Sequence, residues 1–145
     1  MVENKSKFHL EIVSPEGVIF QDQVQEAVIP AYDGEITVLP NHTPLLSRLK
    51  EGEIIIKYEK EELLIAITGG FLEINNNNVY ISSDYAVKAK DIEIAKAQQA
   101  KKRAEELLRE KAENVDLTLI EKDLQRSILE LKVAEKIRKK QRIIQ

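Results

Sequence analysis

The chain has 145 residues, no cysteine and a formal net charge of -3, from 22 basic and 25 acidic residues. The lack of cysteine excludes a disulfide framework, a thiolate nucleophile and the common cysteine-containing zinc sites, so the fold must depend on an apolar core. The longest mostly apolar run, residues 63–72, is far shorter than the roughly 20 residues of a membrane-spanning helix. Residues 1–7 are polar and unlike a secretory signal. We therefore expect a chain that neither spans the membrane nor is secreted.

Composition divides the chain into two segments. Residues 1–87 hold all five glycines, all four prolines and all seven aromatic residues. Their 6 basic and 14 acidic residues give -8, whereas the 16 basic and 11 acidic residues of 88–145 give +5. Turn-forming and aromatic residues concentrated in one segment, and long charged residues in the other, predict two domains of different class.

Residues 1–87 show the pattern of short β-strands. Phe8, Leu10 and Ile12 alternate with less apolar neighbours, and the turn-forming residues 14–17 follow them. Similar segments recur at 24–29, 35–39, 53–58, 63–68, 71–74 and 79–82. Pro30 and Pro40 are expected to end the first two of them. Gly69-Gly70 is expected to form a bulge or tight bend, and the four asparagines 75–78 a hairpin turn. The pattern predicts an antiparallel sandwich or barrel of eight to ten strands.

Residues 88–145 show helical periodicity. The predicted apolar stripe of a first helix is Ala97, Ala100, Ala104, Leu107 and Leu108, with Asp91 as its N-cap. After an interruption at residues 114–116, a second helix is expected to begin at a Thr118–Glu121 capping box, with Asp116 as the competing cap. Its stripe is Leu117, Ile120, Leu124, Ile128, Leu131 and Ala134. Because alanine buries little area, the hairpin either packs closely and permanently or detaches to find another partner.

The sequence offers little catalytic chemistry. His9 lies within a predicted strand, and His42 has no nucleophile or metal ligand at a useful spacing. A basic cluster ends the chain: Lys136, Arg138, Lys139, Lys140 and Arg142. The predicted helices carry no aromatic residue to stack on a base, so an acidic protein surface is a better partner than nucleic acid. The residues alone predict a non-enzymatic, metal-free β-domain with a basic helical hairpin that binds protein.

Three stretches resemble the signature segments of a known family. They are FHLEIVSPEG at 8–17, DGEITVLPNHTPLL at 33–46 and GGFLEI at 69–74. In sequence, order and spacing they are similar to the epsilon subunit of bacterial F-type ATP synthase, and the resemblance extends over residues 7–140. It implies an α+β chain: an antiparallel β-sandwich of about ten strands at 1–87, followed by an α-helical hairpin at 88–145.

The resemblance also implies a function and partners. Family members are non-catalytic rotor subunits of the central stalk, peripheral at the cytoplasmic face of the cell membrane, that couple ion translocation to ATP synthesis. The sandwich is then expected to bind the gamma subunit and the membrane c-ring, with Glu35 and His42 at the ring contact. The hairpin is expected to inhibit ATP hydrolysis by pressing its basic C-terminal residues, 136–142, against the alpha and beta subunits.

Some relatives bind ATP in the hairpin through a motif at the first helix and arginines of the second. The matching residues here are Glu93, Lys96 and Arg126, with Glu93 and Lys96 replacing an aspartate and an arginine, and Glu130 a second arginine. Lysine lacks the planar fork of arginine, and Glu130 would repel phosphate. We therefore expect no bound cofactor and weak or absent ATP binding. The alternatives are a stand-alone nucleotide-sensing module and a coiled-coil dimer.

Overall fold

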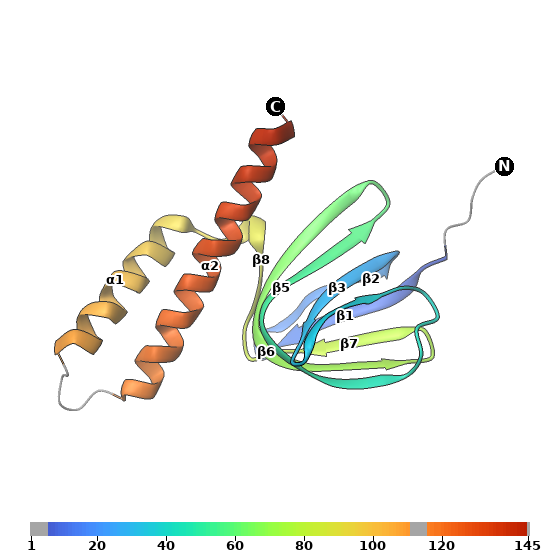
Figure 1. Ribbon diagram of the computed structural model, residues 1–145, viewed down its shortest axis with the longest axis horizontal. Coiled ribbons are helices and arrows are strands. Elements are labelled where there is room, and N and C mark those ends of the chain that lie inside the picture. Colours follow the sequence, from blue (N-terminus) through green and yellow to red (C-terminus); the bar gives the residue numbers. More distant parts are fainter. Residues whose placement is uncertain (1–5, 111–115, 145) are drawn as a thin grey trace. The chain divides into compact units, whose positions relative to one another are not determined.

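The structure, a computed structural model, describes residues 6–110 and 116–144, with the side chains of the last helix described as far as Lys139. The chain divides into two compact units, Met1–Lys88 and Ala89–Gln145. The first contains the strands and the second the helices (Figure 1).

Within the described residues, the first unit has eight strands. In chain order they are β1 (Phe8–Ser14), β2 (Gly17–Val24), β3 (Glu26–Ala31), β4 (Gly34–Val38), β5 (Leu45–Tyr58), β6 (Glu61–Asn75), β7 (Asn78–Ser82) and β8 (Ala86–Lys88). They hydrogen-bond in the order β2-β1-β7-β6-β5-β3-β4, with β8 added to β6. All neighbours are antiparallel except β1 and β7, which run parallel.

Two long strands explain why there are eight strands and not about ten. The predicted strands 63–68 and 71–74 are parts of one strand, β6, and β5 begins eight residues before the predicted 53–58. The sheet folds over on itself along this pair (Figure 1). The expected tight bend is confirmed, since Gly69 and Gly70 have φ of 112° and 140° within β6.

Other strand limits differ from the prediction. The predicted strand 24–29 is divided, because Val24 ends β2 and β3 begins at Glu26. Pro30 does not end β3 but lies within it. The ladder between β3 and β5 is irregular between Val28 and Ala31, and such an irregularity accommodates a residue that has no backbone N–H.

The core of the first unit is formed by the inward-facing residues of these strands. Leu10, Ile12, Ile54, Ile56 and Ile65 are each 0% exposed. They belong to a single cluster of buried apolar side chains drawn from β1 to β8. The cluster lies wholly within the first unit, so the sandwich has an apolar core of its own.

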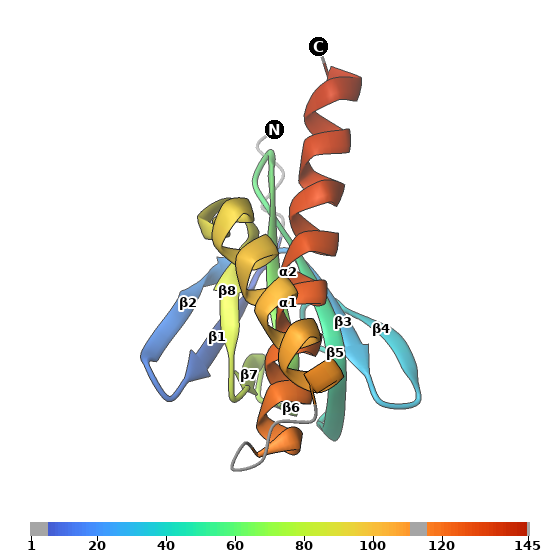
Figure 2. The ribbon, with the colours of Figure 1, turned by 90° about the vertical axis from the view of Figure 1, so that its left-hand side faces the viewer.

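The second unit consists of a short 3-10 turn, η1 (Ala89–Asp91), and two helices, α1 (Ile94–Glu110) and α2 (Leu117–Ile144). The helices lie side by side (Figure 1), and α1 is in front of α2 in the view of Figure 2. They have 17 and 28 residues and are about 26 and 42 Å long. Within the described residues, neither helix is long and apolar enough to cross a bilayer.

The first hydrogen bonds at the N-terminus of each helix show where that helix begins. Asp91 belongs to η1 and does not cap α1, whose first bond runs from the Ala97 N–H to the Glu93 carbonyl, 3.0 Å away. Asp116 caps α2, since its Oδ1 accepts the Thr118 N–H at 3.0 Å and its carbonyl accepts the Ile120 N–H at 3.2 Å. The Thr118 capping box is therefore wrong, because Thr118 already lies inside the helix.

The buried residues of the two helices also differ in part from the apolar stripes that the sequence predicts. In α1, Ala97 and Ala104 are buried, but Ala100 is exposed because it lies about 60° around the helix from Ala97. In α2, Leu117 and Ile128 are largely exposed. Among the side chains of α2 described up to Lys139, the buried ones are Ile120, Ser127, Leu129, Val133 and Ala134.

Candidate interaction surface

One outer face of the sandwich exposes large apolar side chains. Leu46 of β5, Phe71 of β6 and Tyr80 of β7 are 76%, 59% and 42% exposed. In the register, Leu46 pairs with Glu73, and Glu73 with Tyr80. We call Val13, Leu46, Phe71 and Tyr80 the apolar face. Exposed apolar side chains that gather in one place mark a site of association.

A shallow hollow of about 200 Å³ brings these four side chains together. All four members of the apolar face line it. Glu11 and Glu73 also line it, and both pair with Tyr80 in the sheet. The hollow therefore has apolar walls and an acidic edge, which suits a protein side chain that is itself apolar with a basic neighbour.

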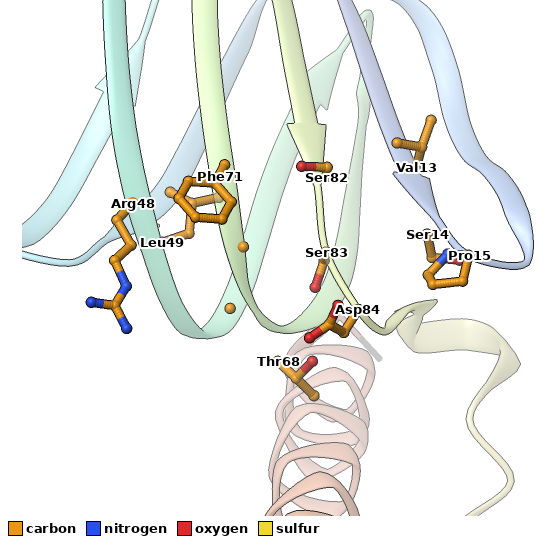
Figure 3. A pocket seen from close by; sticks show the side chains of 12 residues that line it. Val13, Ser14, Pro15, Arg48, Leu49, Thr68, Phe71, Ser82, Ser83 and Asp84 are labelled. Carbon is orange, nitrogen blue, oxygen red and sulfur yellow. The ribbon is translucent and has the colours of Figure 1, made fainter.

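A second hollow, of about 490 Å³, adjoins the apolar face at the bend of β6. Val13, Phe71 and Ser82 line both hollows. Figure 3 shows Arg48, Leu49 and Phe71 on one side, Val13, Ser14 and Pro15 on the other, and Ser82, Ser83 and Asp84 between them. Gly69 and Gly70 line the hollow where β6 bends, between the long side chains of Arg48 and Phe71 and the short ones of Ser82 and Ser83.

Gly70 is the residue that this shape depends on. A Cβ at position 70 would collide with the carbonyl oxygen of Ser82 on the neighbouring strand β7. Its φ of 140° is also one that L-residues rarely adopt. Close approach of β6 to the end of β7 therefore requires glycine at this position.

The structure does not bring Glu35 and His42 together. Glu35 is exposed near the start of β4, opposite Pro30, and His42 follows the end of that strand. The stretch from Glu35 to Val38 alone spans about 10 Å. The His42 ring is half-buried, with its Nδ1 2.7 Å from the carbonyl oxygen of Thr43. The two predicted contact residues thus lie at opposite ends of one edge strand.

The predicted ATP residues lie in the helical unit. Glu93 immediately precedes α1, and its carboxylate is 3.0 Å from the ammonium of Lys96 in the first turn. Arg126 and Glu130 lie one turn apart in the middle of α2. This ion pair is solvent-exposed and therefore weak, but its carboxylate lowers the positive charge that a phosphate would meet at Lys96.

The basic C-terminal residues all belong to α2. Lys136, Arg138 and Lys139 lie within its last turns, and Lys139 is 3.7 Å from Glu135. The side chains of Lys140 and Arg142 lie outside the described residues. Among the side chains that are described, no three His, Asp or Glu residues are placed to bind a metal ion.

The apolar face was not predicted from the sequence, although a signal for it exists. A strand with one solvated face alternates apolar and polar residues, but Leu45-Leu46 and Phe71-Leu72 place two apolar residues in succession. In each pair one side chain must point away from the core. Leu46 and Phe71 are those residues, and both are exposed.

Comparison with known proteins gives consistent matches over both units. Residues 7–89 match the β-sandwich domain of the ATP synthase delta/epsilon chain, and residues 90–135 match its long α-helix domain. The ATP synthase epsilon chain of Nitrosospira multiformis is 41% identical over 134 residues, which cover 92% of this chain and 96% of the relative. That of Dehalococcoides mccartyi is 39% identical over 135 residues, with the same coverage.

Two solved structures share the fold. A chain of the Euglena gracilis mitochondrial ATP synthase, solved as OSCP, F1 and c-ring, has a TM-score of 0.62 and 24% identity, covering 92% of this chain and 80% of its own length. A chain of the central stalk and c-ring of the Tetrahymena thermophila mitochondrial ATP synthase has a TM-score of 0.57 and 13% identity, covering 90% and 98%. At these identities the likeness establishes the arrangement of strands and helices.

Proposed function

The chain belongs to the delta/epsilon chain family of ATP synthase, and we propose that it is a non-catalytic rotor subunit whose helical unit restrains ATP hydrolysis. The observation that carries the proposal is the match of both units: the two family domains meet at residues 89 and 90, within one residue of the division between Lys88 and Ala89. One unit then anchors the subunit in the rotor, and the other regulates the motor.

The sandwich supplies the anchor. Its apolar face, with two adjoining hollows, suits a permanent protein contact, which we assign to the gamma subunit. Glu35 and His42 are assigned to the polar loops of the membrane c-ring. Because they lie at opposite ends of β4, we assign them to separate points of that contact. The subunit is thereby held peripherally at the cytoplasmic face of the membrane.

The helical unit supplies the restraint. Its excess of basic residues suits an acidic segment of the alpha and beta subunits, and Lys136, Arg138 and Lys139 lie together near the end of α2. Its stripe on α1 consists of small side chains, so packing within the hairpin is light. A lightly packed element can exchange one set of contacts for another at low free-energy cost.

The decisive experiment removes the helical unit. ATP synthase lacking this chain is reconstituted with the full chain or with residues 1–89, and ATP hydrolysis and ion-driven ATP synthesis are measured. We expect the shorter chain to restore coupled synthesis while hydrolysis rises several-fold. Unchanged hydrolysis would remove the restraining role, and loss of synthesis would contradict the anchoring role of the sandwich.

A second experiment tests the apolar face. Phe71→Glu places a charge on a side chain that is already exposed, so the fold should persist while affinity for the complex falls at least tenfold, about 1.4 kcal/mol. Val18→Glu is the matched control, because Val18 is 56% exposed but lines neither hollow. Equal losses in the two variants would show that the face has no special role.

We also propose that ATP binds this chain weakly or not at all. The Glu93 carboxylate already pairs with Lys96, and Glu130 lies one turn from Arg126. Thermal unfolding and isothermal titration with and without ATP test this. Micromolar affinity, or a marked rise in the unfolding temperature, would instead favour a nucleotide-sensing module.

A further inference from the structure

The turn between β6 and β7 carries a side chain that joins segments far apart in the sequence. Oδ1 of Asn77 accepts a hydrogen bond from the Asn41 N–H at 2.8 Å. Nδ2 of Asn77 donates to the carbonyl oxygen of Lys7 at 2.9 Å, and the Asn77 carbonyl accepts the His9 N–H at 3.2 Å. One residue therefore binds the loop after β4, the segment before β1 and β1 itself.

The conformation of the turn explains part of this choice of residue. Asn75 pairs with Asn78, so Asn76 and Asn77 form a two-residue hairpin loop with φ of 50° and 62°. Glycine and asparagine are the residues that best tolerate such angles. Glycine would satisfy the backbone equally well, so the turn alone does not require an amide at position 77.

The hydrogen bonds of the Asn77 side chain explain why this position carries a side-chain amide. Its oxygen faces an N–H group and its NH₂ group faces a carbonyl, so both ends meet complementary partners. A flipped amide would place donor against donor and acceptor against acceptor. The Asn77 side chain is thus used at both ends, by two segments 36 and 70 residues away in the sequence.

The loop to which Asn77 is hydrogen-bonded carries His42, one of the two residues predicted to contact the c-ring. Residues 39–44 connect β4 to β5, and Asn41 within them has a left-handed φ of 62°. The His42 N–H bonds to the Leu39 carbonyl at 3.2 Å, which closes a turn. Leu39 is 52% exposed, and the loop leads to Leu46 of the apolar face.

We propose that Asn77 is a positioning residue that holds residues 39–44 in their binding conformation before the chain meets its partner. The role of this loop in binding a partner rests on the proposed function. The fixing of the loop by Asn77 does not, because it depends only on hydrogen bonds within the chain. A loop fixed in advance loses less conformational entropy on docking, and affinity rises accordingly. Asn77 itself need not touch the partner.

The test uses the full chain with three substitutions. Asn77→Gly keeps the left-handed backbone and removes both side-chain bonds. Asn77→Asp keeps the acceptor for the Asn41 N–H and loses the donor to Lys7. Asn76→Gly is the matched control, since it changes the neighbouring left-handed residue and leaves Asn77 in place. Amide hydrogen exchange at Asn41 measures how firmly Asn77 fixes the loop. The affinity of each variant for ATP synthase depleted of this chain measures how much that fixing contributes to binding.

We expect Asn77→Gly to speed exchange at Asn41 and to weaken binding by about threefold to tenfold, the range of one hydrogen bond. Asn77→Asp keeps the acceptor for the Asn41 N–H, but its second carboxylate oxygen faces the Lys7 carbonyl. It should therefore protect Asn41 and retain affinity better than Asn77→Gly does, a partial rescue that a general loss of stability would not give. Asn76→Gly should behave like the wild type.

Three results would overturn the proposal: unchanged Asn41 exchange in Asn77→Gly, exchange in Asn77→Asp as fast as in Asn77→Gly, or lost protection without lost affinity in Asn77→Gly. Failure of the wild-type chain to bind the depleted complex would count against the proposed function, because exchange at Asn41 is measured in the free chain.

Discussion

The β-sandwich and the helical unit bury very different side chains. The sandwich encloses large residues such as Phe8, Ile56 and Ile65 almost completely. The first helix buries only Ala97 and Ala104, which each contribute much less apolar area. The difference teaches that the sandwich has the core of an independent domain, whereas the contact face of α1 buries much less apolar area per residue.

The largest expected loss of stability comes from a substitution at the bend of β6. Gly70→Ala should reduce the free energy of unfolding by about 3 kcal/mol or more, because the added Cβ meets the Ser82 carbonyl and φ is unfavourable. Urea unfolding of the full chain measures this. Gly17→Ala is the control, since Gly17 has φ of 126° but nothing near its missing Cβ, and about 1 kcal/mol is expected there. Equal losses would mean that the collision is relieved by movement of β7.

A second pair of substitutions compares the cores directly. Ile56→Ala in the sandwich should remove about 3 to 4 kcal/mol, since Ile56 is fully buried. Ile120→Ala in α2 should cost about 2 kcal/mol and increase hydrogen exchange only in the helices, leaving β-strand amides protected. If Ile120→Ala exposed the strand amides equally, the two units would form one cooperative structure, and the contrast between them would fail.

The smallest effect concerns the start of α2. Asp116→Ala removes the acceptor for the Thr118 N–H and should reduce helix stability by about 1 kcal/mol. Circular dichroism during thermal unfolding detects the change. Thr118→Ala is the control, because Thr118 lies inside the helix and the capping acceptor belongs to Asp116. A larger loss from Thr118→Ala than from Asp116→Ala would instead favour the Thr118–Glu121 capping box.

The sequence predicted what depends on local chemistry. The division near residue 88, the bend at Gly69-Gly70 and the asparagine turn follow from residues whose backbone preferences are strong, and each is present. The sandwich and the helical hairpin are confirmed as well. Strand number was harder, because a bend inside β6 looks in sequence like the gap between two strands.

The candidate surface could be predicted only in part, because it depends on register. Whether Leu46 or Leu45 faces the core is decided by pairing with Glu73 and Ile74 on β6, far along the chain. The same holds for α2, where neighbours in space select Leu129 and Val133 for burial in place of Ile128. The side-chain bonds of Asn77 likewise join segments that no local pattern connects.

The two long strands have a mechanical consequence. Because β5 and β6 run through both layers, the layers are joined by continuous peptide backbone as well as by side-chain packing. A force that shears one layer against the other must therefore bend covalent chain at Gly69-Gly70 and strain the paired ladder beside it. In the rotor role that we propose, such a joint would yield little, and the sandwich would turn as a stiff body.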